Sequence, residues 1–342
     1  MTESNETLNR LDEPKLKVPN QGLGKLVFLG FLTLVLSVKG PLLLFAPIPM
    51  IIAFLTYGYT RAFSCALFMI GLSIGISFTS VQLATFSTYG ITMISSVLTA
   101  FLVSSIIVSN EHPVKGVFKK GAILVGLVLT LFAGYQLFAE NSLTQEVYRL
   151  VEAQIELTKN DANYQELVKA GGEHARSYQM ALDNPDEIAK TILNWIFSAT
   201  FVGGFFLIWI SFFMILRNKK IWDKFSPYDY STKDLVDFKV PEQLTYVVIF
   251  GLVSYLGAEY IGMPMLEVIG MNIVVSLGVF YFFQGMGIYI EFLNFLKIRG
   301  FIRSFLTLLT IFFAFRFIAV IGFFDLWANF KKYMKKNEGD IS

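Results

Sequence analysis

The sequence predicts an all-α membrane protein: a polytopic transmembrane helical bundle of about nine spans with an extracytoplasmic helical insert. The residue types AVILMFWYC make up 54% of the 342 residues, and only 16% are charged. Soluble domains carry about 25% charged residues, so this composition does not suit a soluble core. Residues 62–110 contain no Asp, Glu, Lys, Arg or His. This stretch is long enough for two bilayer crossings, because one helix needs about 20 apolar residues.

Uncharged apolar segments bounded by charged residues or proline define the predicted spans. Each span must be helical, because lipid offers no partner to backbone groups outside a helix. The first segment is short and Arg316 interrupts the last one, so we expect eight to nine spans. The segments are residues 26–38, 41–59, 62–79, 83–108, 121–139, 191–216, 243–258, 268–290 and 304–324.

Hydrophilic segments divide these spans into two groups. Residues 1–24 are predicted to be a retained cytoplasmic tail, because they carry both charge signs and no small-residue cleavage site follows the next apolar run. An N-terminal bundle of about five spans covers residues 25–139. A C-terminal bundle of about four spans covers residues 191–330. The helical insert at residues 140–190 separates the bundles, and residues 331–342 form a basic tail.

The distribution of Lys and Arg predicts the orientation, because cytoplasmic loops are enriched in these residues. With the N-terminus inside, the basic loops at 115–120, 217–224 and 297–303 share the cytoplasmic face, and the acidic insert lies outside. A single span between Arg303 and Lys331 would place the tail lysines outside, against this rule. Either the last segment is re-entrant or the rule fails there.

The two long hydrophilic segments are also expected to have structure. In the insert, Ser142 and Gln145 have capping-box spacing, and Asn184 before Pro185 is typical of a helix start. We expect a helical cap on the outer membrane surface, with a solvated connector as the alternative. The connector at residues 222–240 mixes aromatic and charged residues, which predicts a position in the headgroup region.

Several short motifs are shared with a known family. They are Ala46-Pro47-Ile48-Pro49, Tyr57-Gly58, Arg61-Ala62, Phe238-Lys239-Val240-Pro241, Phe283-Gln284-Gly285 and the stretch from Gly322 to Lys332. Through them the chain from Lys25 to Lys332 resembles the YybS-like family of predicted bacterial membrane proteins. That family has no established activity, so the resemblance implies an architecture and a location in the bacterial cytoplasmic (inner) membrane.

A second resemblance concerns the first six spans. Their proline-bearing second span, which ends in Tyr57-Gly58, and the basic loop between the fourth and fifth spans look like S components of energy-coupling-factor vitamin transporters. This likeness implies a pocket for a small solute and a coupling complex as partner. Residues 26–38 lack the Ala-x-x-x-Ala motif with which S components dock on that partner.

No catalytic or metal-binding constellation stands out. The predicted topology places His112 and His174 on opposite sides of the membrane, so they cannot share a metal ion. Walker-type, Gly-x-Ser-x-Gly and His-Glu-x-x-His motifs do not occur. The single cysteine, Cys65, is interpreted as a small buried apolar residue. The sequence therefore predicts no enzyme, cofactor or metal, and the net charge of +2 with no basic aromatic tract predicts no nucleic-acid partner.

Polar residues at membrane depth carry the main functional signal, because they are costly there and mark a pathway, a pocket or a buried pair. The candidates for ligand binding or buried polar pairing are Asn272, Gln284, Arg316 and Asp325. An antiparallel hairpin turning near Gly300 would bring Arg316 level with Gln284, and Asp325 level with Asn272. We therefore expect these two pairs.

Glycines supply the other structural signal. Gly71 and Gly75 form a small-xxx-small motif, which predicts close helix packing. The pair Gly203-Gly204 and the pair Gly285 and Gly287 are expected to be packing or kink points.

Two functions remain open from the sequence. The first is a membrane subunit that binds or translocates a small solute, whose partners are the lipid bilayer, a small-molecule ligand and other membrane proteins or a coupling complex. The second is a non-transporting scaffold or accessory protein of the cell envelope, in which the polar residues hold helices together.

Overall fold

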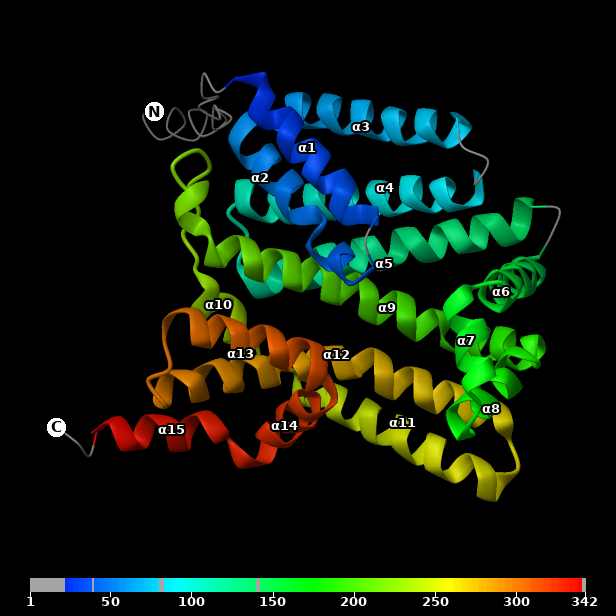
Figure 1. Cartoon of the computed structure of the whole chain (residues 1–342). Coiled ribbons are helices and arrows are strands. Elements are labelled where there is room, and N and C mark those ends of the chain that lie inside the picture. The colour runs from blue at the N-terminus through cyan, green and yellow to red at the C-terminus, as the bar shows by residue number, and fades with distance from the viewer. Residues whose placement is uncertain (1–21, 39, 80–82, 140–141, 340–342) are drawn as a thin grey trace, which may run out of the picture. The chain divides into compact units, whose positions relative to one another are not determined.

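The structure is a computed structural model that describes residues 22–38, 40–79, 83–139 and 142–339. Its regular elements are all helices, and these residues contain no strand (Figure 1). The predicted fold class, an all-α membrane bundle, is confirmed.

Each predicted span falls on helical structure, because an apolar segment satisfies its backbone groups internally only as a helix. The N-terminal group comprises α1 (Leu23–Val38), η2 (Gly40–Phe45), α2 (Pro47–Tyr57), α3 (Tyr59–Thr79), α4 (Leu83–Val108) and α5 (Pro113–Phe138). The C-terminal group comprises α9 (Pro185–Arg217), α11 (Glu242–Ile261), α12 (Pro264–Phe295), α13 (Gly300–Phe313), α14 (Phe315–Ala328) and α15 (Phe330–Gly339).

The helices differ in whether they are long enough to cross a membrane. Within the described residues, α5, α9, α11 and α12 are the four helices that are long and apolar enough to cross a membrane. The pair α13 and α14 passes the same test together but is bent by 93° at Ala314, so the last predicted span is not one straight helix. The apolar helices α1 and α2 are shorter, with 16 and 11 residues.

The helices form two compact units. The first unit contains the chain up to Gly121 and Phe205–Phe238, and the second contains Ala122–Gly204 and the chain from Lys239 onward. The predicted domains were continuous in sequence, whereas these units are not, because α5 and α9 each contribute residues to both. The insert therefore belongs to the same unit as the C-terminal helices.

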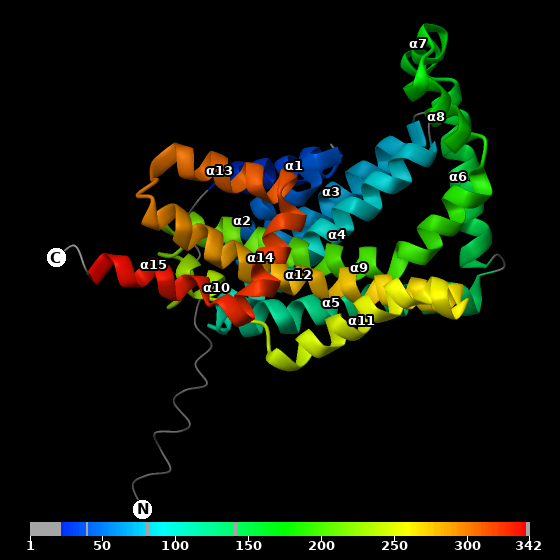
Figure 2. The ribbon, with the colours of Figure 1, turned by 90° about the horizontal axis from the view of Figure 1, so that it is seen from below.

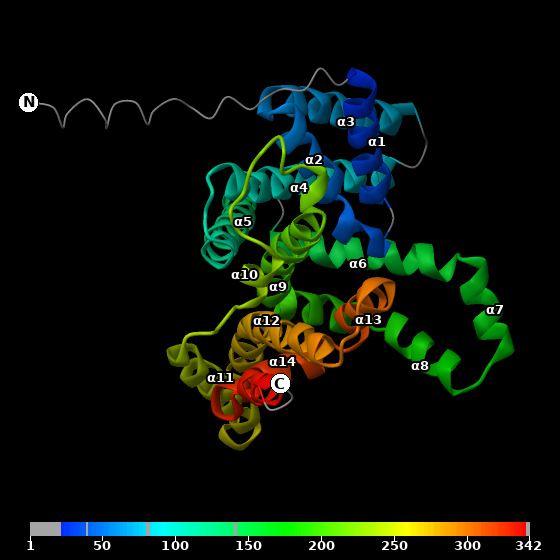
Figure 3. The ribbon, with the colours of Figure 1, turned by 90° about the vertical axis from the view of Figure 1, so that its left-hand side faces the viewer.

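In the first unit, α1–α4 pack on one another, with α2 at the centre (Figure 3). Met50, Phe54 and Leu55 of α2 are almost fully buried, and the Phe54 ring lies 4.9 Å from that of Phe63 in α3. Cys65 is buried as predicted, and its thiol donates to the carbonyl oxygen of Leu26 at 3.6 Å. Apolar packing thus holds this unit together.

The connector, with η3 (Lys219–Ile221) and α10 (Thr232–Val236), is folded into the first unit. Trp222, Tyr228 and Phe238 are buried, and the Tyr228 hydroxyl donates to the carbonyl oxygen of Glu111 at 2.7 Å. Ser226 donates to a carbonyl oxygen of α2 at 3.2 Å. The connector is thus packed against the protein through three of its aromatic rings, whereas its position at the headgroup level stays a prediction.

The insert consists of α6 (Leu143–Lys159), α7 (Ala162–Ala170) and α8 (Glu173–Leu182). The predicted capping box at Ser142 is formed. Val147 and Val151 of α6 pack against Ala189 in the first turns of α9. The insert is therefore helical and docked on α9, whereas its extracytoplasmic position stays a prediction.

Candidate functional site

Two of the predicted polar residues, Gln284 and Asp325, meet where α14 packs across α12 (Figure 2). A Cβ atom added at Gly285 would overlap the carbonyl oxygen of Ile318, and one at Gly322 would overlap that of Tyr281. The added Cβ at Gly322 would also lie 2.8 Å from the backbone nitrogen of Gly285. The two helices therefore approach backbone to backbone, which only glycine allows. The predicted packing role of Gly285 is confirmed.

Gln284, beside this contact, is buried, with 5% of its surface exposed. Its Oε1 accepts the backbone N–H of Val240 at 2.7 Å, and its Nε2 donates to Asp325 Oδ2 at 3.1 Å. Asp325 Oδ1 accepts the backbone N–H of Phe330 at 2.8 Å. One amide and one carboxylate thus join the start of α11, α12, the end of α14 and the start of α15.

Asn272 serves a separate contact between α12 and α9. Its Oδ1 accepts the backbone N–H of Ser198 at 3.1 Å, and its Nδ2 donates to the carbonyl oxygen of Asn194 at 2.8 Å. These two groups of α9 are four residues apart, the pair that an α-helix bonds together. Asn272 therefore inserts its amide beside a main-chain hydrogen bond of α9, where both donor and acceptor are within reach.

The predicted pairs are not the observed ones. Gln284 bonds Asp325 and not Arg316, and Asn272 bonds α9 and not Asp325. The prediction assumed one straight helix after the turn, but the chain turns by 93° at Ala314. Because α14 crosses α12 and does not run on along it, each residue of α14 lies beside a different residue of α12 from the one predicted. Gln284 and Asp325 are brought together, and Arg316 is not.

Arg316 is the second residue of α14 and is exposed. It makes no hydrogen bond or ion pair with any residue in the described part of the chain. Its guanidinium lies at the N-terminal end of a helix of 14 residues, where the helix dipole also favours negative charge. This end of α14 therefore combines two features that attract an anion.

The glycine pair in α3 behaves differently. Gly71 and Gly75 are exposed, and a Cβ atom on either would meet nothing within 4 Å. No described helix packs on them. The close helix contact that their spacing predicts is therefore not formed among the described residues. The close contact at Gly285 and Gly322 joins two different helices, and no spacing within one segment could reveal it.

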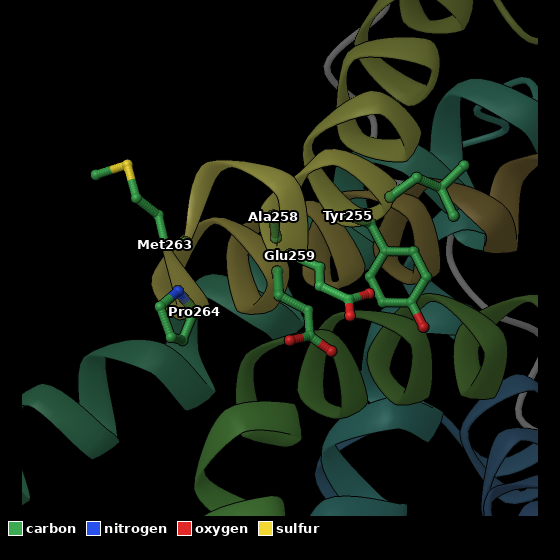
Figure 4. A pocket seen from close by; sticks show the side chains of 8 residues that line it. Tyr255, Ala258, Glu259, Met263 and Pro264 are labelled. Carbon is green, nitrogen blue, oxygen red and sulfur yellow. The ribbon is translucent and has the colours of Figure 1, made fainter.

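A hollow of about 500 Å³ lies at the turn between α11 and α12 (Figure 4). Tyr255 and Glu259 of α11 project to the same side of this turn, and Glu267 in the first turn of α12 also lines the hollow. Glu259 and Glu267 are exposed, so their carboxylates need no buried partner. Both occupy helix ends.

The comparison with known families covers the region that holds these contacts. A family model described as a predicted membrane protein (DUF2232) matches residues 26–326. No curated protein and no solved structure matches the chain. The matched region spans most of the 342 residues and includes Asn272, Gln284, Arg316 and Asp325. The chain therefore belongs to the DUF2232 family of predicted membrane proteins.

Proposed function

We propose that the protein is a membrane subunit that binds a small solute with an anionic group, and that Arg316 recognises that group. The observation behind this proposal is the exposed Arg316 guanidinium directly after the 93° bend, with no bonded partner in the described ranges. Charged residues inside apolar membrane segments are paired or line a water-filled pathway. Because these ranges supply no anion to Arg316, an anion from solution is the partner we infer.

The broken helix supports the same function. Irregular backbone at membrane depth is tolerated where protein buries it or where it lines a water-filled cavity. In many transporters the N-terminus of a half-helix points at an anionic group of the substrate. The guanidinium adds a full charge and a fork of N–H donors that matches carboxylate and phosphate oxygens. The ligand class is therefore a small carboxylate or phosphate compound.

The resemblance of the first six spans to S components also favours solute binding. Since residues 26–38 lack the docking motif, the proposal includes no coupling complex. It does include the bacterial cytoplasmic membrane as location, with the N-terminus and the basic loops inside, because Lys and Arg concentrate on one set of loops.

A scaffold or accessory role in the cell envelope is the second candidate. The observation in its favour is that Asn272, Gln284 and Asp325 all bond to groups of the same chain. Three of the four predicted site residues thus act as contacts between helices. On this reading Arg316 would bind another protein.

Thermal unfolding of the purified protein in detergent tests the solute site. The panel contains small carboxylates and phosphates, with neutral and cationic compounds of similar size. A ligand at 100 times its Kd should stabilise the protein by about 2.7 kcal/mol. We expect stabilisation by at least one anionic class, its loss in Arg316→Gln, and its retention in Arg299→Gln. Arg299 is the matched control, because it is an exposed arginine at the opposite end of α13.

Stabilisation that persists in Arg316→Gln would refute the role of Arg316. If no anion stabilises the wild-type protein, the solute function fails. Copurification of an envelope assembly from native membranes would then support the scaffold role.

A further inference from the structure

We propose that the chain returns after α13 to the face on which α11 begins, and that α15 there binds the anionic headgroups of the lipid bilayer. This inference rests on residues other than Arg316 and does not depend on the solute site.

The hydrogen bonds around Gln284 fix the level at which α14 ends. Val240 lies just before α11 and donates to Gln284, which in turn donates to Asp325 in the last turn of α14. Phe330, the first residue of α15, donates to Asp325. The start of α11, the end of α14 and the start of α15 therefore lie together.

The position of Gln284 along α12 indicates that α13 and α14 together do not pass through the whole membrane. Gln284 is 20 residues from Pro264 at one end of α12 and 11 residues from Phe295 at the other. At the α-helical rise these separations are roughly 30 Å and 16 Å. If the segment passed through the whole membrane, the end of α14 would lie near Pro264. Its bond to Gln284 keeps it nearer the α12–α13 turn, so the last apolar segment is re-entrant.

This return resolves the conflict over the tail lysines. In Figure 1 and Figure 2, α15 runs toward the same end of the second unit as the turn between α12 and α13. That turn carries Lys297, Arg299 and Arg303. With the chain re-entrant, α15 lies on the face of this basic turn, as the positive-inside rule requires.

The composition of α15 is typical of a segment that binds an anionic membrane surface. Trp327 at the end of α14 and Tyr333 in α15 are 60% and 68% exposed, and such rings favour the headgroup level. The helix contains a single acidic residue, Glu338. Its basic residues are Lys331, Lys332, Lys335 and Lys336.

The attachment of α15 to α14 favours a lipid headgroup over a free anion as the partner of α15. The helix starts one residue after a segment that enters the apolar layer, so its first turn lies close to the bilayer surface. Polybasic segments are attracted to anionic lipids when they lie within a Debye length of the membrane, about 8 Å at physiological salt. The partner we assign is therefore the cytoplasmic leaflet with its anionic phospholipids.

A fluorophore sensitive to polarity at Tyr333→Cys, in a Cys65→Ala background, tests lipid binding. The full chain is placed in nanodiscs of phosphatidylcholine, with and without phosphatidylglycerol. We expect a blue shift of the emission with phosphatidylglycerol, a smaller shift at high salt, and its loss when the four lysines of α15 become Gln. A label at Lys233→Cys, an exposed site on α10, is the control and should not shift.

Equal emission in both kinds of nanodisc, or a shift that survives the four Gln substitutions, would overturn the proposal. Glycerol phosphate added to phosphatidylcholine nanodiscs should cause no shift, and an equal shift would mean that the site takes a free anion. If the fourfold variant does not fold, salt dependence in the wild-type lysine background decides the question.

Labelling of intact cells with an impermeant thiol reagent tests the return of the chain. In the same background, Ser177→Cys in α8 should react, whereas Lys233→Cys and Lys332→Cys should react only after permeabilisation. Reaction of Lys332→Cys together with Ser177→Cys would show that the tail lies on the insert face. That result would overturn the re-entrant segment whatever the outcome of the solute assays.

Discussion

Gln284 donates its buried side-chain amide to Asp325 at 3.1 Å, which joins α12 to the end of α14. The same amide accepts the N–H of Val240 at 2.7 Å. A single side chain thus satisfies a main-chain donor and a carboxylate that would otherwise be costly in an apolar layer. This contact holds the end of α14, the helix that carries Arg316, against α12.

Replacing Gln284 by Leu should lower the free energy of unfolding by about 1–2 kcal/mol, because it strands the Val240 N–H and takes a partner from Asp325. Unfolding in detergent measures this loss. Asp325→Leu should cost less in the Gln284→Leu background than alone, because the two residues share one hydrogen bond. Additive losses in this double-mutant cycle would contradict the pairing.

Gly285→Ala should destabilise the protein by on the order of 3 kcal/mol, because its Cβ would overlap a main-chain carbonyl of α14 that cannot move alone. Gly278→Ala is the matched control on the same helix, since a Cβ there meets nothing within 4 Å. It should be neutral or stabilise α12 by up to about 1 kcal/mol. Thermal unfolding of both variants checks the crossing, and equal effects would argue against it.

Val151→Ala should loosen the insert by about 1–2 kcal/mol, because Val151 packs in the small core that α6 forms with Ala189. Limited proteolysis should then cut α7 and α8 faster than in the wild type. The neighbouring Leu150 is 59% exposed, so Leu150→Ala should leave the cleavage rate unchanged. Similar rates for the two variants would mean that the insert is not docked through this core.

Ser231→Ala should make stability less dependent on acid pH. The Ser231 hydroxyl donates to Asp234 at 2.7 Å, and together with the Ser231 N–H it lowers the pKa of that carboxyl below its ordinary value. A carboxyl with a lowered pKa stabilises the fold above its unfolded pKa of about 3.9, and this contribution is lost as the pH falls through the folded pKa.

The Tm of Ser231→Ala should therefore be lower than that of the wild type at neutral pH, and the gap should narrow below about pH 4. Part of the gap persists at low pH, because Ser231 also caps α10 by accepting the N–H of Lys233. Ser177→Ala, at an exposed serine of α8, is the control. A gap that stays constant with pH would contradict the coupling to Asp234.

The sequence predicted the helices well, because long uncharged segments have few alternatives to a helix in lipid. It did not predict the bend at Ala314, since no Gly or Pro marks the run from Phe312 to Phe317. The partners of Gln284 were missed for that reason. Burial of Trp222 and Tyr228 was missed because aromatic residues beside charges suit both a headgroup layer and a protein interior.

The candidate residues were chosen correctly as polar positions that need partners, but composition cannot say which groups those partners are. Asn272 bonds main-chain groups of α9, and Gln284 bonds a main-chain N–H before α11. Main-chain groups are present at every residue, so the sequence carries no sign of them. Of the four candidate residues, Arg316 is the one that has no bonded partner among the described residues, so its partner lies outside them.

The reaction rate of Ala314→Cys with charged thiol reagents tests most directly whether Arg316 faces a water-filled site for an anion. In a Cys65→Ala background, we expect position 314 to react with water-soluble reagents, and an anionic reagent to react several-fold faster than a cationic one of similar size. Arg316→Gln should remove this preference, and Arg299→Gln should keep it. An unreactive thiol, or a preference that does not change in Arg316→Gln, would contradict the proposed site.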